Sequence, residues 1–426
     1  MNLLRTTLDN GLKVLIRESH TAPVVSFWVW YRVGSRNEHT GITGISHWVE
    51  HMLFKGTPRW PQDAADEAVS REGGTFNGLT WYDFTTYYET LPAHKISLAL
   101  DIESDRMGNA LFDPAEVESE RTVIISERQG AENSPLFLLS EEISSAAYRV
   151  HPYRHDTVGF LCDLQAITRD DLYNHYQTFY SPNNAILAIA GDFNAGEIER
   201  IVERYFGRLE ARADAPPVRA VEPPQRGERR VVVEGAGLTD YLEIAFRAPD
   251  ARHADLFALT VLNAILCGGS GFLVGRGSIT NFTSRLYRAL VDKELAVDVG
   301  GYLTPTVDPG LYRVLATVWP GRTLAEVEQA LFDAVERLQE TPVGQQELEK
   351  AQRQARALFA YSNESISHQA FWLGFSEIFA DYGWVMRYLD NLEAVTTEDI
   401  RRVAQTYLKP RNRTVGWYLA NKQPGG

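Results

Sequence analysis

The chain has 426 residues and a formal net charge of −14 at pH 7, and 44% of its residues are hydrophobic. This length predicts two to three domains with enough apolar side chains for large cores. The acidic charge and the lack of a long basic block argue against a nucleic-acid partner, and no apolar run approaches the roughly 20 residues of a membrane span.

The start of the chain and its cysteine content favour a cytoplasmic protein. The sequence runs from Met1 directly into a strand-like segment, with no basic and apolar leader. Cys162 and Cys267 are too few for a disulfide framework, and both have apolar neighbours. We therefore expect two reduced cysteines in the core.

The N-terminal half predicts strands and helices in alternation. An Asn-Gly turn at 8–12 precedes strand-like runs at 13–16 and 24–33. A helix with the motif described below follows, and after it come a β-rich run at 80–88, helices at 94–110, 114–130, 169–179 and 195–206, and a strand at 186–190.

The segment between 44 and 54 contains His47, Glu50 and His51 in the order H-x-x-E-H. Residues three and four apart share one face of a helix, so both imidazoles can reach one metal ion. Zinc accepts imidazole ligands, and the neighbouring carboxylate can take a proton from water. The motif alone is only suggestive, because two surface histidines on an amphipathic helix are the plain alternative.

A third ligand is predicted further along the chain. Glu120 and Glu127 are seven residues apart and therefore lie on one helical face. The apolar residues between them indicate a partly buried helix, where a carboxylate needs a partner such as a metal ion. The alternative is an ordinary charged helix exposed to solvent.

The second half repeats this plan faintly, after a linker rich in Pro and charge at 213–228. A strand at 241–246 precedes a helix at 254–266, and Gly300-Gly301 mirrors Gly73-Gly74. The residues of this helix that correspond to the motif include no histidine and no acid. We expect two homologous α+β lobes of about 200 residues, at 1–212 and 229–426, with the metal in the first only.

The combined pattern resembles the M16 family of zinc metallopeptidases (pitrilysin-like inverzincins). Glu127 follows His51 by 76 residues, within Glu120-Arg-Thr-Val-Ile-Ile-Ser-Glu127, as in the short two-domain, M16B-type branch related to mitochondrial processing peptidase subunits. This resemblance spans nearly the whole chain. It implies two α/β-sandwich lobes (the LuxS/MPP-like metallohydrolase fold) and one Zn²⁺ per chain. His47, His51 and Glu127 are then the ligands, Glu50 the general base and Glu120 a supporting carboxylate.

The resemblance also implies a substrate-binding edge strand. Thr75, Phe76, Asn77 and Gly78 resemble the family motif G-G-x-x-N-A-x-T, with glycine in place of the usual alanine. A peptide can bind by adding a strand to such an edge. The plain alternative is a turn before a structural strand. His151 and His155 are expected to be turn or capping residues rather than metal ligands.

One departure from the family bears on the partner. Many active members carry an Arg and a Tyr in the second lobe that stabilise the oxyanion, but Val291 and Val297 align with them here. Losing one such donor typically costs about 2.7–4 kcal/mol. We therefore expect a heterodimer whose homologous partner lacks H-x-x-E-H and supplies these groups. The alternative is a self-sufficient homodimer or monomer that uses Arg285, Tyr287 or Arg288.

These observations predict a zinc endopeptidase subunit that hydrolyses peptides or unfolded segments in a closed chamber. A glycine-rich segment at 267–280 resembles the loop of processing-peptidase partner subunits that contacts peptide. Two other classes stay open, a catalytically idle structural subunit and a module that binds peptides without cutting them. Neither explains an intact set of four zinc-site residues as directly.

Overall fold

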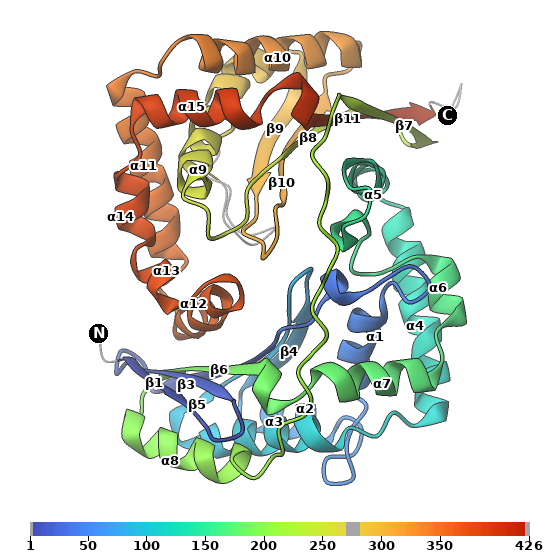
Figure 1. Cartoon of the computed structure of the whole chain (residues 1–426), viewed down its shortest axis with the longest axis vertical. Helices are drawn as coiled ribbons and strands as arrows, with labels where there is room; N and C mark the ends of the chain where they lie inside the picture. Colours follow the sequence, from blue (N-terminus) through green and yellow to red (C-terminus); the bar gives the residue numbers. More distant parts are fainter. Residues whose placement is uncertain (1–2, 270–281, 422–426) are drawn as a thin grey trace. The chain divides into compact units, whose positions relative to one another are not determined.

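The computed structural model describes residues 3–269 and 282–421 (Figure 1). The glycine-rich segment predicted to contact peptide lies mostly outside these residues. Two compact units make up the chain. The first unit comprises Met1–Gly130, His155–Ala220 and Asn363–Tyr382, and the second unit comprises Ala131–Arg154, Val221–Ser362 and Gly383–Gly426.

The first unit is built on a six-stranded mixed sheet in the order β1-β2-β6-β3-β5-β4. Its central strands, β3 and β6, are almost fully buried, and β4 forms an edge that pairs with β5 alone. The strands are β1 (Leu3–Thr7), β2 (Lys13–Glu18), β3 (Val24–Tyr31), β4 (Thr75–Thr80), β5 (Thr85–Pro92) and β6 (Ala185–Gly191).

Helices cover both faces of this sheet. Helix α3 packs on β3 and helix α8 packs on β2, whereas α12 packs on β3 and β6. The helix with the metal motif, α1, packs against β4 and α7. The helices of this unit are α1 (Ile45–Met52), α2 (Ala64–Arg71), α3 (Ile96–Asn109), α4 (Pro114–Glu132), α6 (Leu161–Ala166), α7 (Arg169–Phe179), α8 (Ala195–Phe206) and α12 (Ile366–Phe379).

Strand β3 shows why the sheet is covered on both sides. Its sequence, VVSFWVWY, is bulky at every position but one. Because successive side chains point to opposite faces, Phe27 and Val29 join the main core, whereas Trp28 and Trp30 make edge-on and tilted ring contacts with Phe371 of α12. Such a continuous apolar run is typical of a strand buried on both faces.

The second unit has a five-stranded sheet in the order β7-β11-β8-β10-β9. Helix α5 packs on β7, β8 and β11, and helix α10 packs on β8 and β10. The strands are β7 (Arg229–Ala236), β8 (Tyr241–Arg247), β9 (Ala296–Leu303), β10 (Leu311–Val318) and β11 (Arg413–Asn421); the helices are α5 (Pro135–Ala147), α9 (Asp255–Leu266), α10 (Leu324–Glu340), α11 (Gln345–Tyr361), α13 (Tyr382–Met386), α14 (Tyr388–Glu393) and α15 (Thr397–Tyr407).

The predicted α+β architecture of two sheet-and-helix lobes is confirmed, but each unit takes one helix from the other half of the chain. Helix α12 comes from the C-terminal half and completes the first unit, and α5 comes from the N-terminal half and completes the second. Residues 213–228, the predicted linker, contain neither helix nor strand. None of the described helices combines the length and apolar character that crossing a membrane requires.

Two local predictions were wrong. The β-rich run at 80–88 is interrupted: β4 ends at Thr80, a turn covers residues 81–84, and β5 begins at Thr85. Because β4 and β5 pair as a hairpin, the residues that connect them, 81–84, lie within the segment predicted as one strand. Cys162 is exposed rather than buried, because it lies on the outer face of the short helix α6. Cys267 is largely buried, and both thiols are free.

The contact between α12 and β3 should depend on Gly374. A Cβ atom added there would lie 2.1 Å from Trp30 Nε1, and Trp30 is fully buried among aromatic rings. We expect Gly374→Ala to destabilise the protein by about 1–3 kcal/mol through overpacking. Thermal or urea unfolding would measure this loss.

The matched control is Gly130→Ala in helix α4, where an added Cβ meets no atom within 4 Å. Alanine favours a helix over glycine by about 1 kcal/mol, so this variant should be neutral or more stable. Equal stability of Gly374→Ala and Gly130→Ala would contradict the packing described for α12.

Candidate metal centre

Helix α1 begins at a backbone turn held by a buried carboxylate. Gly44 precedes the helix with a left-handed φ of +87° and offers no side chain to cap it. Instead, Glu38 accepts hydrogen bonds from the amides of Gly44 (2.8 Å) and Ser46 (2.9 Å). His155 Nε2 lies 3.0 Å from the same carboxylate. A negative charge at a helix N-terminus is favourable, so this contact fixes where α1 starts.

The electrostatics of Glu38 agree with this role. Burial acts to raise the pKa of its carboxyl group, but hydrogen bonds from His155 and from the two amides outweigh burial and lower it. Glu38 therefore stays ionised although it is buried. His155 contacts the capping carboxylate of Glu38, which agrees with its interpretation as a turn or capping residue. His151 belongs to the second unit and pairs with Asp308 at 3.0 Å.

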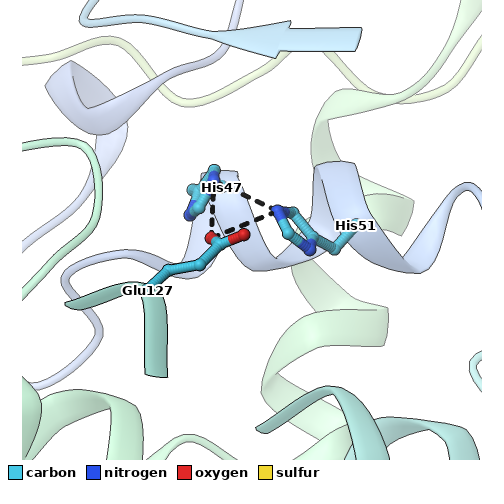
Figure 2. A group of neighbouring side chains, drawn as sticks. All are labelled: His47, His51 and Glu127. Atoms are coloured by element: carbon cyan, nitrogen blue, oxygen red, sulfur yellow. Dashed lines mark hydrogen bonds and ion pairs between the residues drawn. The ribbon is translucent and has the colours of Figure 1, made fainter. Parts of the chain in front are cut away.

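The three predicted ligands converge. His47 and His51 project from α1 and Glu127 from α4 (Figure 2). The two Nε2 atoms are 3.2 Å apart, and Glu127 Oε2 lies 3.7 Å from His47 Nε2 and 3.6 Å from His51 Nε2. Ligands about 2.0–2.1 Å from a tetrahedral zinc ion are separated by roughly 3.3 Å. The donor set and its spacing therefore fit zinc.

The pKa values of the two histidines are shifted in opposite directions. Burial, and next the charge of His51, lower the pKa of His47 to about 4, so His47 is neutral at pH 7 and its Nε2 can act as a ligand. Burial also acts to lower the pKa of His51, but its hydrogen bond to Glu120 and the nearby carboxylates raise it above the usual value. A divalent cation would replace the proton that these carboxylates attract.

Glu120 orients His51. His51 Nδ1 lies 2.7 Å from Glu120 Oε1, and because a carboxylate only accepts, Nδ1 carries the proton and leaves Nε2 for the metal. Lys55 Nζ lies 2.6 Å from the other oxygen of Glu120. Burial acts to raise the pKa of Glu120, but its hydrogen bonds to His51 and Lys55 lower it. The predicted supporting carboxylate is thus in contact with a predicted ligand.

Glu50 lies beside the ligands without joining them. Burial raises the pKa of its carboxyl group, while a hydrogen bond from Thr80 Oγ1 to Oε2 (2.6 Å) opposes that shift. Thr80 is the last residue of β4. A Cβ added at Gly78 would lie 2.9 Å from Glu50 Oε1, so the edge strand passes directly next to this carboxylate. A buried carboxyl group with a raised pKa at such a place is typical of an acid–base residue.

The predicted substrate residues all lie on β4. Thr75, Phe76, Asn77 and Gly78 alternate between exposed and half-buried positions. The Phe76 ring packs against Phe54 at 5.1 Å between centroids. The outer edge of β4 pairs with none of the other described strands, which leaves backbone groups available to an added strand, although the Gly78 amide already donates to Asn77 Oδ1 at 2.8 Å.

Several residues that hold this site were not predicted. Glu38 carried no signal, since it belongs to no spaced motif with His47. Thr80 is the last residue of the edge-strand motif G-G-x-x-N-A-x-T, but the motif did not indicate a contact with Glu50. Lys55 lies in Phe54-Lys-Gly-Thr57, where a positive charge one helical turn after His51 could have indicated a partner for Glu120.

The second-lobe positions discussed above lie in the second unit. Val291 ends a π-helical turn, Tyr287–Val291, and Val297 lies on β9 with half of its surface exposed. Arg285, one of the alternative oxyanion donors, pairs with Glu347 through Nε and Nη2 at 2.9 and 2.8 Å. Its guanidinium is therefore already bound by a carboxylate.

Two sequence models of one peptidase family match the chain in succession. The model described as "Insulinase (Peptidase family M16)" matches residues 13–159, and the model described as "Peptidase M16 inactive domain" matches residues 166–355. The chain belongs to the M16 peptidase family. This confirms the family predicted from the H-x-x-E-H motif and from Glu127. The motif lies within the first matched segment.

Relatives and solved structures agree with this family. The chain is 29% identical to the zinc protease PqqE of Helicobacter pylori, over 96% of this chain and 90% of that protein. It is also 29% identical to a probable mitochondrial-processing peptidase subunit beta of Arabidopsis thaliana, over 73% of this chain and 58% of that protein. The crystal structure of a protease from Helicobacter pylori has a TM-score of 0.92 at 28% identity and covers 98% of this M16 chain and 99% of its own.

The link between Glu120 and His51 can be tested in the metal-free protein. Because the hydrogen bond and charge of Glu120 raise the pKa of His51, Glu120→Gln should lower that pKa. An NMR titration of the histidine ring protons measures the shift. His20, whose pKa Asp192 and Glu18 raise, is the internal control and should titrate as in the unmodified M16 chain. An unchanged His51 would contradict the contact.

Proposed function

We propose that this M16 chain is the zinc-bearing subunit of an endopeptidase that cuts extended peptides or unfolded segments. The observation that carries the proposal is the convergence of His47, His51 and Glu127 next to Glu50 and the free edge of β4. One zinc ion per chain fits these ligands. When bound, it would supply Lewis-acid polarisation of the substrate carbonyl and lower the pKa of water.

Glu50 would act as the general base. Its carboxylate would take the proton of the attacking water and then pass that proton to the leaving amine. Burial raises the pKa of Glu50 toward the range in which it can both accept and release a proton. The hydrogen bond from Thr80 Oγ1 occupies Oε2 and leaves Oε1 for the water. Glu120, through its hydrogen bond with His51, would hold that imidazole in the orientation needed for metal binding.

The substrate would bind as an added strand on β4. Its backbone would pair with residues 75–78, of which Gly78 has no side chain between the peptide and Glu50. A segment must be extended to pair with a strand edge, which a short peptide or an unfolded segment can readily become. The closed chamber and the cytoplasmic location remain predictions.

The first test separates chemistry from metal binding. Glu50→Gln keeps the shape and the Thr80 contact but cannot take a proton, so turnover should fall by at least about 10²–10⁴-fold while zinc content stays the same. Cleavage of quenched fluorescent peptides and elemental analysis measure the two properties. The matched control is Glu118→Gln, an exposed acid on α4, which should alter neither.

Removing a metal ligand should lower the zinc content as well as the activity, unlike Glu50→Gln. His47→Ala should lose zinc and activity together. If Glu50→Gln also lost its zinc, Glu50 would be a ligand or a structural residue rather than the base. If the chain bound peptides equally well with and without zinc, and the zinc-loaded form released no product, the module that binds peptides without cutting them would be supported instead.

The division of labour with a partner is the finer part of this proposal. The side chains of Val291 and Val297 have no hydrogen-bond donor, and Arg285 is engaged by Glu347. One relative is itself named as a subunit of a processing peptidase. A homologous chain without H-x-x-E-H would then supply the Arg and Tyr that stabilise the oxyanion. The self-sufficient homodimer is the main alternative.

The isolated chain should therefore be slow. We expect that adding such a homologue raises kcat/KM by about 10²–10³-fold, the effect of one oxyanion donor, with no change in zinc content. Mixing the two purified chains and recording peptide cleavage measures this gain. Strong Glu50-dependent activity of the isolated chain that the homologue leaves unchanged would rule out the divided site in favour of the self-sufficient enzyme.

A further inference from the structure

Arg106 of helix α3 lies in an unusual place beneath the edge strand. Only 3% of its surface is exposed, and its guanidinium carbon lies 4.0 Å from the ring centre of Tyr87, 4.9 Å from that of Phe76 and 5.3 Å from that of Phe54. A planar cation can stack on aromatic faces in this way. One side chain thus contacts three separate segments of the first unit.

The charge of Arg106 is balanced from its own helix. Nε donates to Glu103 Oε2 at 2.9 Å, and Nη2 forms an ion pair with the other oxygen of Glu103. Glu89, on β5, is fully buried nearby, and burial together with the neighbouring Glu103 raises the pKa of its carboxyl group well above the usual value. Within residues 3–269 and 282–421, Arg106 Nη1 has no hydrogen-bond partner. The aromatic rings are therefore its main remaining contacts.

A buried ion pair contributes little net stability, and apolar residues of the same size often replace one without loss. What Arg106 adds here is geometry. Phe54 lies one helical turn after Glu50, Phe76 belongs to β4, and Tyr87 is the β5 residue directly opposite Gly78. The guanidinium therefore connects the end of the metal helix, the edge strand and the strand that supports it.

The same contacts shape a cavity. Phe54, Phe76 and Arg106 line it together with Trp60, Leu53 and Ile102, and its volume is about 210 Å³. Since two of these rings, Phe54 and Phe76, pack against the guanidinium, a shift of Arg106 would change both the cavity and the position of β4.

We propose that Arg106 is a positioning residue that holds β4 at a fixed distance from Glu50 and sets which substrate side chain the adjoining cavity accepts. The part about substrate rests on the proposed peptidase function. The part about β4 does not, because the position of a strand can be measured without any reaction.

Arg106→Lys tests this inference. Lysine keeps a positive charge for Glu103 but loses the flat guanidinium that stacks between the rings. Hydrogen exchange of the amides at 75–80 should accelerate by roughly 10-fold or more, while exchange in the central strand β6 and the zinc content should not change. Arg59→Lys is the matched control, since Arg59 is largely exposed and pairs with Asp101. It should behave like the unmodified chain.

The kinetic arm uses peptides that differ only in the size of one side chain next to the cleaved bond. Arg106→Lys should raise KM by roughly 10-fold and flatten the preference among these peptides, with kcat changed much less, because a substrate strand that is misplaced by about 1 Å binds and aligns poorly. A purely structural role would lower the amount of folded protein without altering KM or the preference.

Failure of the two proposals can be told apart. If the unmodified chain cuts no peptide in any partnered form, the peptidase proposal fails, and exchange at 75–80 still decides whether Arg106 positions β4. If exchange there equals that of the unmodified chain, the positioning role is overturned whatever the activity. Should Arg106→Lys not fold, the double variant Arg106→Met with Glu103→Gln removes both charges. The same hydrogen-exchange and kinetic measurements would then be made on this double variant.

Discussion

The first unit depends on how it compensates the polar side chains that α1 carries into its interior. Two imidazoles and a carboxylate within five residues would be costly to bury without partners. His47 Nδ1 has no hydrogen-bond partner in the described part of the chain, but Glu38 binds the helix N-terminus, Glu120 binds His51, and Thr80 binds Glu50. These partners come from a loop, a second helix and the edge strand. The contacts that compensate these buried polar groups therefore also bring the residues of the site together.

This arrangement also separates the roles of the carboxylates. Glu120 is kept ionised by Lys55 and His51, whereas burial raises the pKa of Glu50. Glu127, from the same helix as Glu120, faces the two imidazoles instead. Three glutamates thus lie around one metal motif in three different environments, and these environments suit the three proposed roles of supporting carboxylate, metal ligand and proton acceptor.

Much of the site could be predicted because its signals are local. The order of His47, Glu50 and His51 follows from helical spacing, and the helices at 169–179 and 195–206 have the bounds expected from their periodicity. The remainder depends on tertiary contacts. Glu38 and His155 meet across 117 residues, and Arg106 contacts three segments that no periodicity connects. The turn at 81–84 was missed because β-prone residues lie on both sides of it.

The exchange of α5 and α12 has a consequence for the newly made protein. The face of β3 that carries Trp28 and Trp30 is covered by α12, which lies near the C-terminal end of the chain. During synthesis on the ribosome, the sheet beside the metal helix stays uncovered until nearly all of the chain has emerged. An aromatic surface of this kind invites aggregation or chaperone binding. A product truncated before α12 would therefore contain His47, Glu50, His51 and Glu127 and still leave this aromatic face of β3 uncovered.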